Sequence, residues 1–212
     1  PMTQGGGTAM SRGDWADAVQ DIISQSSYLN VGILAEYDTL TDYINITAEV
    51  YYTDSLPVDG FGFQPTNYLN IILTQDSVLG PQTGGSQYNP GAIVPGPWQP
   101  TYSHQHMVRE YITGQWGMPL SNTLVYPGDL FTNTFTYAIP NNINDILFDI
   151  NNIKVVAFVT ETQLGEIITG TGCDVTSPVS VGISEYNLSK SNTYNRIYDI
   201  LGREWKVQFG NL

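Results

Sequence analysis

The chain has 212 residues and carries seven lysines and arginines against twenty aspartates and glutamates, a formal net charge of −13. This acidity argues against nucleic acid or an anionic membrane surface as a partner, because the attraction to phosphate that dominates such binding would become a repulsion. No stretch of about 18 apolar residues occurs, so we expect no transmembrane segment. The single cysteine, Cys173, excludes an internal disulfide.

The polar residues of the chain are mostly uncharged. Only 13% of the residues are charged, and fourteen tyrosines together with many threonines, asparagines, serines and glycines take their place. This composition is typical of extracellular β-proteins. The first residues have neither the basic nor the apolar region of a signal peptide, so we expect any export signal to lie upstream of residue 1.

The spacing of the apolar residues changes near Tyr28. Before it, apolar residues at helical spacing predict a short helix near residues 14–25. After it, residues 28–38 and 41–54 alternate between apolar and polar, which predicts two long strands. The segment DTLTD between them predicts a tight turn and therefore a hairpin.

A long loop is predicted between Leu79 and Pro100. This segment holds five glycines and five prolines, a density at which we expect neither helix nor strand. Loops of this length inside a compact domain are usually functional or disordered.

Further strands are predicted on both sides of this loop. YLNIILTQDSV precedes it, and LFTNTFTYAIP follows it with clear alternation. IKVVAFVTET is almost entirely apolar, so we expect it at the centre of a sheet, with GEIITG as its hairpin partner. Beyond Gly170 we expect a linker, and then a short segment of strand character around a glycine turn.

Together these elements predict an all-β fold. Seven or eight strands with long loops and one short N-terminal helix indicate an antiparallel β-sandwich of the Greek-key or jelly-roll type. We expect three regions: residues 1–28 as an N-terminal tail with the short helix, 29–170 as the sandwich domain, and 171–212 as a linker and the start of a C-terminal segment.

Four stretches together resemble one known family. LNIILTQDSVLGPQTGG, YSHQHMVREYITGQWG, FTYAIP and IKVVAFVTET follow one another in the order and spacing of the outer membrane protein twenty-eight-related family of Bacteroidetes surface proteins. H-x-H-x-x-R followed by TGQWG is the most specific element, and the resemblance covers roughly residues 8–170. It implies an extracellular location at the cell surface or outer membrane.

The two ends carry further resemblances. GGTAMSRGDW is similar to the point at which such proteins leave a preceding thioredoxin-like domain, which implies that residues 1–28 are a remnant of that domain. TYNRIYDILGREW is similar to the C-terminal sorting domains of type IX secretion cargo. The second resemblance implies a secreted or surface-anchored protein of the same bacterial group.

The only two histidines, His104 and His106, lie one residue apart. On one continuous strand both imidazoles would share a face with Glu110 and could form part of a metal site. Glu110 would lie about 13 Å from His104 along such a strand, so the third ligand would have to come from elsewhere, and we expect neither a metal nor another cofactor. We interpret His104, His106 and Arg109 as structural residues that fix a long loop, with Arg109 paired to a carboxylate.

Four aromatic residues gather in the sequence around the glycine- and proline-rich loop: Tyr88, Trp98, Tyr102 and Trp116. Exposed rings on a rigid sandwich commonly bind sugars or protein partners. We therefore predict these four as ligand-binding residues. The alternative, in which Trp98 and Trp116 plug the ends of the sandwich, stays open.

The leading interpretation is a non-catalytic extracellular module for binding, adhesion or surface assembly. Its partner would be a protein or a carbohydrate at the cell surface, or copies of the chain itself.

Two alternatives remain beside it. One is a glycan-processing hydrolase on a jelly roll, which needs a pair of carboxylates. Seven acids are candidates for that pair: Asp38, Asp42, Glu49, Asp54, Asp59, Asp76 and Glu110. Their spacing favours no particular pair, so we predict no enzyme. The other alternative is a self-assembling structural subunit whose edge strands pair between copies.

Overall fold

The computed structural model describes most of the chain, namely residues 11–58, 61–96, 100–176, 197–198 and 204–205. The contacts divide the chain into two units, Pro1–Pro178 and Val179–Leu212. In the second unit, β14 (Ile197–Tyr198) pairs antiparallel with β15 (Glu204–Trp205), which is the strand character predicted for this segment. The first unit is built on two larger antiparallel sheets.

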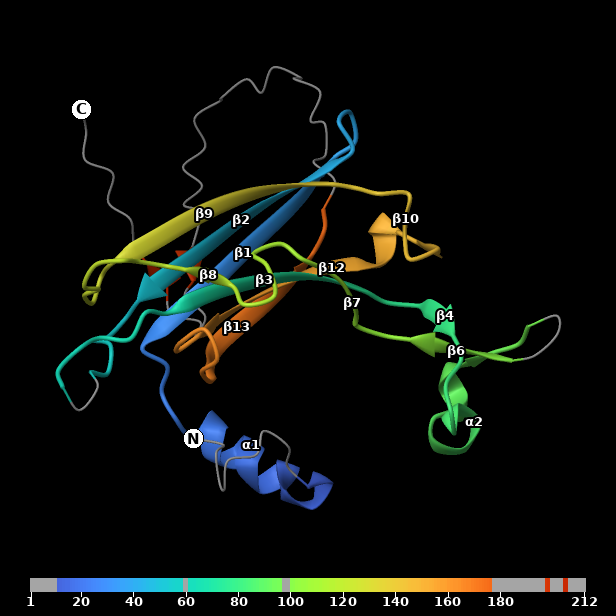
Figure 1. The fold of residues 1–212 in the computed structure, drawn as a ribbon, viewed down its shortest axis with the longest axis horizontal. Helices are drawn as coiled ribbons and strands as arrows, with labels where there is room; N and C mark the ends of the chain where they lie inside the picture. Colours follow the sequence, from blue (N-terminus) through green and yellow to red (C-terminus); the bar gives the residue numbers. More distant parts are fainter. Residues whose placement is uncertain (1–10, 59–60, 97–99, 177–196, 199–203, 206–212) are drawn as a thin grey trace. The chain divides into compact units, whose positions relative to one another are not determined.

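The first of these sheets has the strand order β1–β2–β9 (Figure 1). β1 (Leu29–Asp38) and β2 (Tyr43–Tyr52) form the expected hairpin, and β9 (Leu130–Ala138) lies along the other side of β2. Burial alternates along β2 and β9, because successive side chains of a strand point to opposite faces. One face of the sheet therefore contributes to the core and the other is exposed.

Asp38 closes the turn of the hairpin. Its carboxylate accepts hydrogen bonds from the Thr41 hydroxyl at 2.7 Å and from the Leu40 amide at 2.9 Å. These bonds favour the charged form, so the pKa of Asp38 lies below its usual value. Asp42 follows with a φ of 57°, a left-handed conformation that aspartate tolerates better than most residues. The acidic residues of DTLTD thus build the predicted turn.

The second sheet has the order β13–β12–β3–β7, with β8 also paired to β3. Its strands are β3 (Tyr68–Gln75), β7 (Met107–Tyr111), β8 (Met118–Pro119), β12 (Ile153–Thr160) and β13 (Ile167–Asp174). β12 lies between β3 and β13, which confirms the central position predicted from its apolar sequence and the hairpin with the segment that follows.

A main-chain connection joins the two sheets after β13. The strand runs past Gly170, where we expected a linker to begin, and ends at Asp174. The Thr176 amide then donates to the Ala35 carbonyl at 3.0 Å, and the Thr176 carbonyl accepts from the Tyr37 amide at 2.9 Å. Hydrogen-bond partners on β12 and then on β1 keep this segment extended despite its glycines.

Apolar residues from both sheets form one core. The buried side chains from the long strands are Leu29, Ala35, Ile44, Ile46, Ala48, Val50, Tyr52, Leu69, Ile71, Leu73, Ile153, Val155, Ala157 and Val159. Two antiparallel sheets that share one core constitute a β-sandwich. The predicted all-β sandwich is confirmed.

A short helix precedes the sheets. η1 (Arg12–Asp14) leads into α1 (Trp15–Ile23), which confirms the predicted helix. α1 buries none of its residues, and its large apolar side chains are exposed: Trp15, Val19, Ile22 and Ile23. Within the described ranges, no helix has the length and apolar character needed to cross a membrane.

Residues 76–106 form an excursion from the second sheet between β3 and β7, which we call the arm (Figure 1). Its three-stranded sheet has the order β4–β6–β5. Its elements are β4 (Val78–Gly80), α2 (Gly85–Tyr88), η2 (Pro90–Ala92), β5 (Ile93–Val94) and β6 (Thr101–His104). The prediction of a loop without regular structure was therefore wrong.

Glycines that lie under aromatic rings explain the regular structure of the arm. Gly84 has a φ of 74° and caps α2. A Cβ on Gly85 would lie 2.8 Å from the Tyr102 ring, and one on Gly84 would lie 3.0 Å from the Tyr88 ring. The side-chain amide of Asn89 donates to the Tyr102 hydroxyl at 3.0 Å. These glycines allow close packing of rings on the main chain, whereas we had interpreted them only as breakers of regular structure.

A small hairpin lies between β9 and β12. β10 (Asn142–Ile143) pairs with β11 (Ile146–Leu147), and η3 (Ile150–Asn152) follows. The two turn residues, Asn144 and Asp145, both have positive φ, 53° and 63°. This is the pattern of a type I′ turn, which favours Asn and Asp.

Gly170→Ala should destabilise the second sheet. A Cβ at this position would lie 2.8 Å from the Phe158 Cβ and 2.9 Å from the Ala157 carbonyl oxygen. Because such overpacking costs about 1–3 kcal/mol, we expect urea denaturation to show a loss of that size in the free energy of unfolding. Gly172→Ala is the matched control on the same strand, since its nearest neighbour would be 3.4 Å away. Equal losses in the two variants would contradict this account.

Candidate functional site

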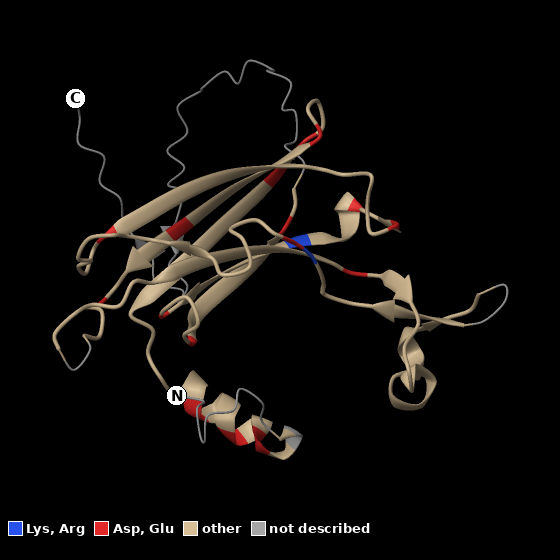
Figure 2. Cartoon of the chain, in the orientation of Figure 1, with Lys and Arg blue, Asp and Glu red and all other residues tan. Residues whose placement is uncertain are grey.

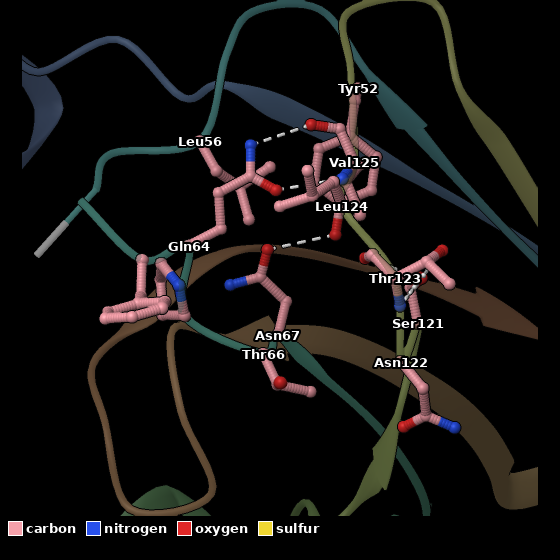
Figure 3. A pocket seen from close by; sticks show the side chains of 12 residues that line it. Tyr52, Leu56, Gln64, Thr66, Asn67, Ser121, Asn122, Thr123, Leu124 and Val125 are labelled. Carbon is pink, nitrogen blue, oxygen red and sulfur yellow. Dashed lines mark hydrogen bonds between the residues drawn. The ribbon is translucent and has the colours of Figure 1, made fainter.

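A cavity of about 330 Å³ opens at one end of the sandwich, where the loop from β2 to β3 faces the segment from β8 to β9 (Figure 3). We call it the loop-end cavity. Its lining comes from both segments: Tyr52, Leu56, Phe63, Gln64, Pro65, Thr66, Asn67, Ser121, Asn122, Thr123, Leu124 and Val125.

Gln64 links the two walls of the loop-end cavity. Its side-chain amide donates to the Val125 carbonyl at 2.9 Å and accepts from the Val125 amide at 2.8 Å. The Gln64 side chain thus pairs with Val125 as a neighbouring strand would (Figure 3). Two hydrogen bonds between segments 61 residues apart hold the walls at a fixed separation.

Asn67 anchors the base of the same loop. Only 3% of this residue is exposed. Its side-chain oxygen accepts from the Tyr52 hydroxyl at 2.9 Å, and its side-chain nitrogen donates to the Glu161 carbonyl at 3.1 Å and the Tyr28 hydroxyl at 3.3 Å. Burial raises the pKa of Tyr52 and of Tyr28, since the charged phenolate would be poorly solvated there. The amide of Asn67 therefore joins strand ends from both sheets.

Segment 121–125 forms the opposite wall. The Ser121 hydroxyl accepts from the Thr123 amide at 3.1 Å and donates to the Thr123 carbonyl at 3.0 Å. The Leu120 amide just before it donates to the Asn67 carbonyl at 2.9 Å. This wall is thus fixed both by its own turn and by the base of the facing loop.

The lining of the loop-end cavity is uncharged. None of its side chains is acidic or basic, although the chain as a whole carries a charge of −13. Within the described part of the chain, no hydrogen bond uses the side chains of Thr66 and Asn122, so a hydroxyl and an amide remain available. Phe63, which is 70% exposed, adds an aromatic ring.

A second cavity, of about 430 Å³, adjoins the first. Phe63, Gln64 and Pro65 line both, and the second is completed by Pro57, Val58, Glu161 and Thr162. Phe63 therefore stands between two neighbouring hollows. Such an arrangement suits an extended ligand that passes over one aromatic ring.

The aromatic residues predicted as ligand-binding lie elsewhere. Tyr88 and Tyr102 belong to the arm, whereas Trp116 follows β7 and is half exposed. Trp98 lies outside the described residues. None of the three that are described lines the loop-end cavity or its neighbour, and ligand binding by this set stays a prediction.

His104 and His106 do not share the face of one strand, because the strand breaks between them. β6 ends at His104, and His106 has a φ of 56°. The His104 ring packs against Tyr102 with 4.9 Å between centroids. The His106 amide donates to the Asp76 carboxylate at 2.7 Å. The idea of two imidazoles and Glu110 on one face was therefore wrong.

The Asp76 carboxylate forms the base of the arm. Besides the His106 amide, it lies 3.9 Å from the Lys154 ammonium and 3.7 Å from the His106 imidazole. Ser77, the residue after Asp76 where the chain enters the arm, has a positive φ of 62°, as His106 does where the chain leaves it. The backbone therefore turns both where it enters and where it leaves the arm. Asp76 connects these two turns to Lys154 of β12.

Arg109 holds the β10–β11 hairpin. Its guanidinium donates to the Ile146 carbonyl at 2.9 Å and to the Ile143 carbonyl at 3.3 Å. These partners are carbonyls, whereas we expected a carboxylate. Both carbonyls accept from the same guanidinium nitrogen, Nη2, which carries two N–H donors, and this explains an arginine at this place.

The described acids of the hydrolase alternative line neither the loop-end cavity nor its neighbour, where Glu161 is the one charged side chain. Asp59 lies outside the described residues. In the part of the chain that the structure describes, no three His, Cys, Asp or Glu side chains gather closely enough to hold a metal ion.

Comparison with known proteins identifies the family. The outer membrane protein Omp28 family matches residues 6–170. The chain belongs to this family. The resemblance of residues 8–170 to this family is thereby confirmed, and membership assigns this Omp28 protein to the outer membrane and the cell surface. No curated protein matches the chain. Among solved structures, a domain of the outer membrane lipoprotein Omp28 from Porphyromonas gingivalis is similar at 19% identity and a TM-score of 0.43, over 72% of this chain and 92% of that chain.

Tyr52→Phe tests the anchor of this Omp28 chain. The variant leaves the Asn67 oxygen without its donor, so we expect the free energy of unfolding at pH 7 to fall by about 1–3 kcal/mol. The raised pKa of Tyr52 also stabilises the fold below about pH 10, where an unfolded tyrosine is still neutral, and this contribution is lost as the pH rises further. Between pH 8 and about pH 11, the free energy of unfolding should therefore fall less steeply with pH in Tyr52→Phe than in the wild type. Parallel plots of unfolding free energy against pH for the two proteins would contradict this.

Arg109→Ala should release the β10–β11 hairpin of the Omp28 chain. Hydrogen bonds to a charged donor contribute about 1.5–3 kcal/mol, so we expect amide hydrogen exchange over residues 142–147 to accelerate about tenfold or more. Lys154→Ala is the control, because Lys154 is the other cation of the described sandwich strands and lies at the arm base. Exchange that accelerates equally in both variants would rule out a specific role for Arg109.

Proposed function

We propose that this Omp28 protein is a non-catalytic binding module of the bacterial cell surface, and that its loop-end cavity takes a neutral, hydroxyl-rich ligand such as a segment of a glycan. The observation that carries the proposal is the uncharged lining of this cavity in a chain of charge −13. An acidic surface repels anionic ligands at long range, and an uncharged cavity offers no countercharge to bind ions.

The chemistry of the lining supports a sugar-like ligand. Thr66 and Asn122 supply a hydroxyl and an amide that can both donate and accept hydrogen bonds. The exposed ring of Phe63 offers a flat apolar surface for the C–H face of a pyranose. The links through Gln64 and Asn67 hold these groups in place before a ligand arrives, which lowers the entropic cost of binding.

The absence of catalysis in this proposal rests on the charge distribution. Hydrolysis of a glycosidic bond requires two carboxylates about 5–10 Å apart. Among the described residues, those that line the two cavities include the single acid Glu161. A ligand held there would be bound and not cleaved.

The C-terminal unit fits a role in transport to the surface. The stretch TYNRIYDILGREW is similar to type IX sorting domains, and within it Ile197–Tyr198 pairs with Glu204–Trp205. We propose that residues 171–212 lead into a sorting segment and that residues 29–170 perform the binding. Adhesion to a glycan-coated surface would be the biological result.

Phe63→Ala tests this function directly. The probes are cellohexaose, xylohexaose and mannohexaose, with hexagalacturonate as an acidic comparison, and binding is measured by calorimetry. We expect at least one neutral probe to bind and Phe63→Ala to weaken it about tenfold or more, as loss of a central aromatic anchor does.

Phe61→Ala is the matched control, because Phe61 lies in the same loop, is 89% exposed and lines neither cavity. Its affinity should stay within about twofold of the wild type. Equal losses in the two variants, or tighter binding of hexagalacturonate, would refute the proposal. Release of shorter sugars from a neutral probe would show an enzyme instead.

A further inference from the structure

Among the described residues, β9 has one paired edge and one open edge. It pairs with β2 on one side and is the last strand of its sheet on the other (Figure 1). Its sequence is LFTNTFTYA, from Leu130 to Ala138. A long edge strand presents unpaired main-chain groups to which another strand can add.

The hydrogen bonds at the two ends of β9 identify which groups are unpaired. The Tyr52 amide donates to the Asp129 carbonyl at 2.9 Å, and the Ile139 amide donates to the Asp42 carbonyl at 3.0 Å. In an antiparallel ladder every second residue bonds to a given neighbour. In the register between β2 and β9, the odd-numbered residues of β9 therefore direct their amides and carbonyls toward β2.

The even-numbered residues therefore direct their amides and carbonyls away from β2. At the centre of the strand these residues are Thr132, Thr134 and Thr136, all exposed. Within the described part of the chain, no hydrogen bond engages the main-chain groups of these three threonines. The edge is thus open over its central stretch.

β9 also differs in composition from the other edge strands of the two large sheets. β1 contains Glu36 and Asp38, β7 contains Glu110, and β13 contains Asp174. β9 contains no charged residue (Figure 2). Its sequence also lacks glycine and proline. Charged side chains and prolines are common means by which proteins prevent edge-to-edge pairing. In an acidic chain, β9 is therefore the edge at which two copies meet without like-charge repulsion.

The strand matches itself when it is turned by a two-fold axis at Thr134. Thr134 then faces the partner's Thr134, and Thr132 faces the partner's Thr136. Each of these pairs would exchange two main-chain hydrogen bonds, because the groups involved are the unpaired ones. Threonine pairs across strands are favourable.

The inner face of β9 gains from the same pairing. Phe131 and Tyr137 are half-buried at the rim of the core. The two-fold axis sets Phe131 of one copy opposite Tyr137 of the other, which extends the apolar layer across the junction. Cross-strand aromatic pairs of this kind add stability.

We propose that the open edge of β9 pairs antiparallel with β9 of a second copy, centred on Thr134, so that two sheets of three strands become one sheet of six. This pairing does not depend on the ligand of the loop-end cavity. It would give the surface protein two ligand sites for each assembly, and bivalent attachment strengthens weak surface binding.

Thr134→Lys tests the pairing with the whole 212-residue chain. Sedimentation velocity over a concentration series should show a monomer–dimer equilibrium in the wild type. Thr134→Lys sets two like charges face to face, so we expect the dimer dissociation constant to rise about tenfold or more. Asn30→Lys, on the exposed face of β1 at the opposite edge of the same sheet, is the control and should dimerise like the wild type. Circular dichroism verifies that both variants are folded.

Thr134→Glu gives the complementary arm of the experiment. Alone it should be monomeric, whereas an equimolar mixture with Thr134→Lys should form a mixed dimer because opposite charges then meet. A wild type that stays monomeric at every concentration, or a Thr134→Lys variant that dimerises as the wild type does, would overturn the proposal.

Cysteine substitutions test the register. In a Cys173→Ser background, Thr134→Cys should form a disulfide-linked dimer under mild oxidation, since the two Cα atoms of a hydrogen-bonded pair lie about 5.5 Å apart. Thr132→Cys should not, because its partner is Thr136 and not itself. Equal crosslinking of both variants would contradict pairing centred on Thr134.

Discussion

The buried side-chain amide of Asn67 is the interaction on which the arrangement of this Omp28 protein depends. It accepts from Tyr52 at the end of β2 and donates to Tyr28 and to the Glu161 carbonyl after β12. One residue thereby connects the first sheet to the second at the end where the loops of the cavity begin. A buried amide left without partners would cost about 1–3 kcal/mol, so this network also specifies a single arrangement. The cavity is positioned by the same hydrogen bonds that hold the sandwich together.

The uneven distribution of charge separates structural from functional surfaces. Arg109 and Lys154, the cations of the described sandwich strands, stabilise the β10–β11 hairpin and the base of the arm. Several of the acids lie in exposed turns or on edge strands, among them Asp42, Glu36 and Asp174. The loop-end cavity and the edge of β9 are both uncharged, and each is suited to a neutral partner: hydroxyl groups in one case and a second main chain in the other. A surface module can combine the two, since the ligand sites and the pairing edge use different residues.

The sequence predicted those parts of the fold that follow from local pattern. The predictions of the β1–β2 hairpin and of the central position of β12 were correct. Alternation of apolar and polar residues indicates a strand buried on one face, and a continuous apolar run indicates a strand buried on both. The arm was missed, since Gly84 and Gly85 permit ring packing as readily as they break strands. The break between His104 and His106 was missed because it depends on Asp76, which is distant in sequence. The cavity could not be predicted from GFGFQPTN. Gln64 and Asn67 shape it through hydrogen bonds to Val125 and Tyr52, which are distant in the sequence.

The most direct test of the central claim is a map of the ligand contacts by amide chemical shifts. The labelled chain is titrated with whichever neutral hexasaccharide binds in calorimetry. If the loop-end cavity is the site, the largest shifts will fall on Phe63, Gln64, Thr66 and residues 121–125. Shifts confined to the arm, around Tyr88 and Tyr102, would contradict this account and would favour the aromatic residues predicted from the sequence alone.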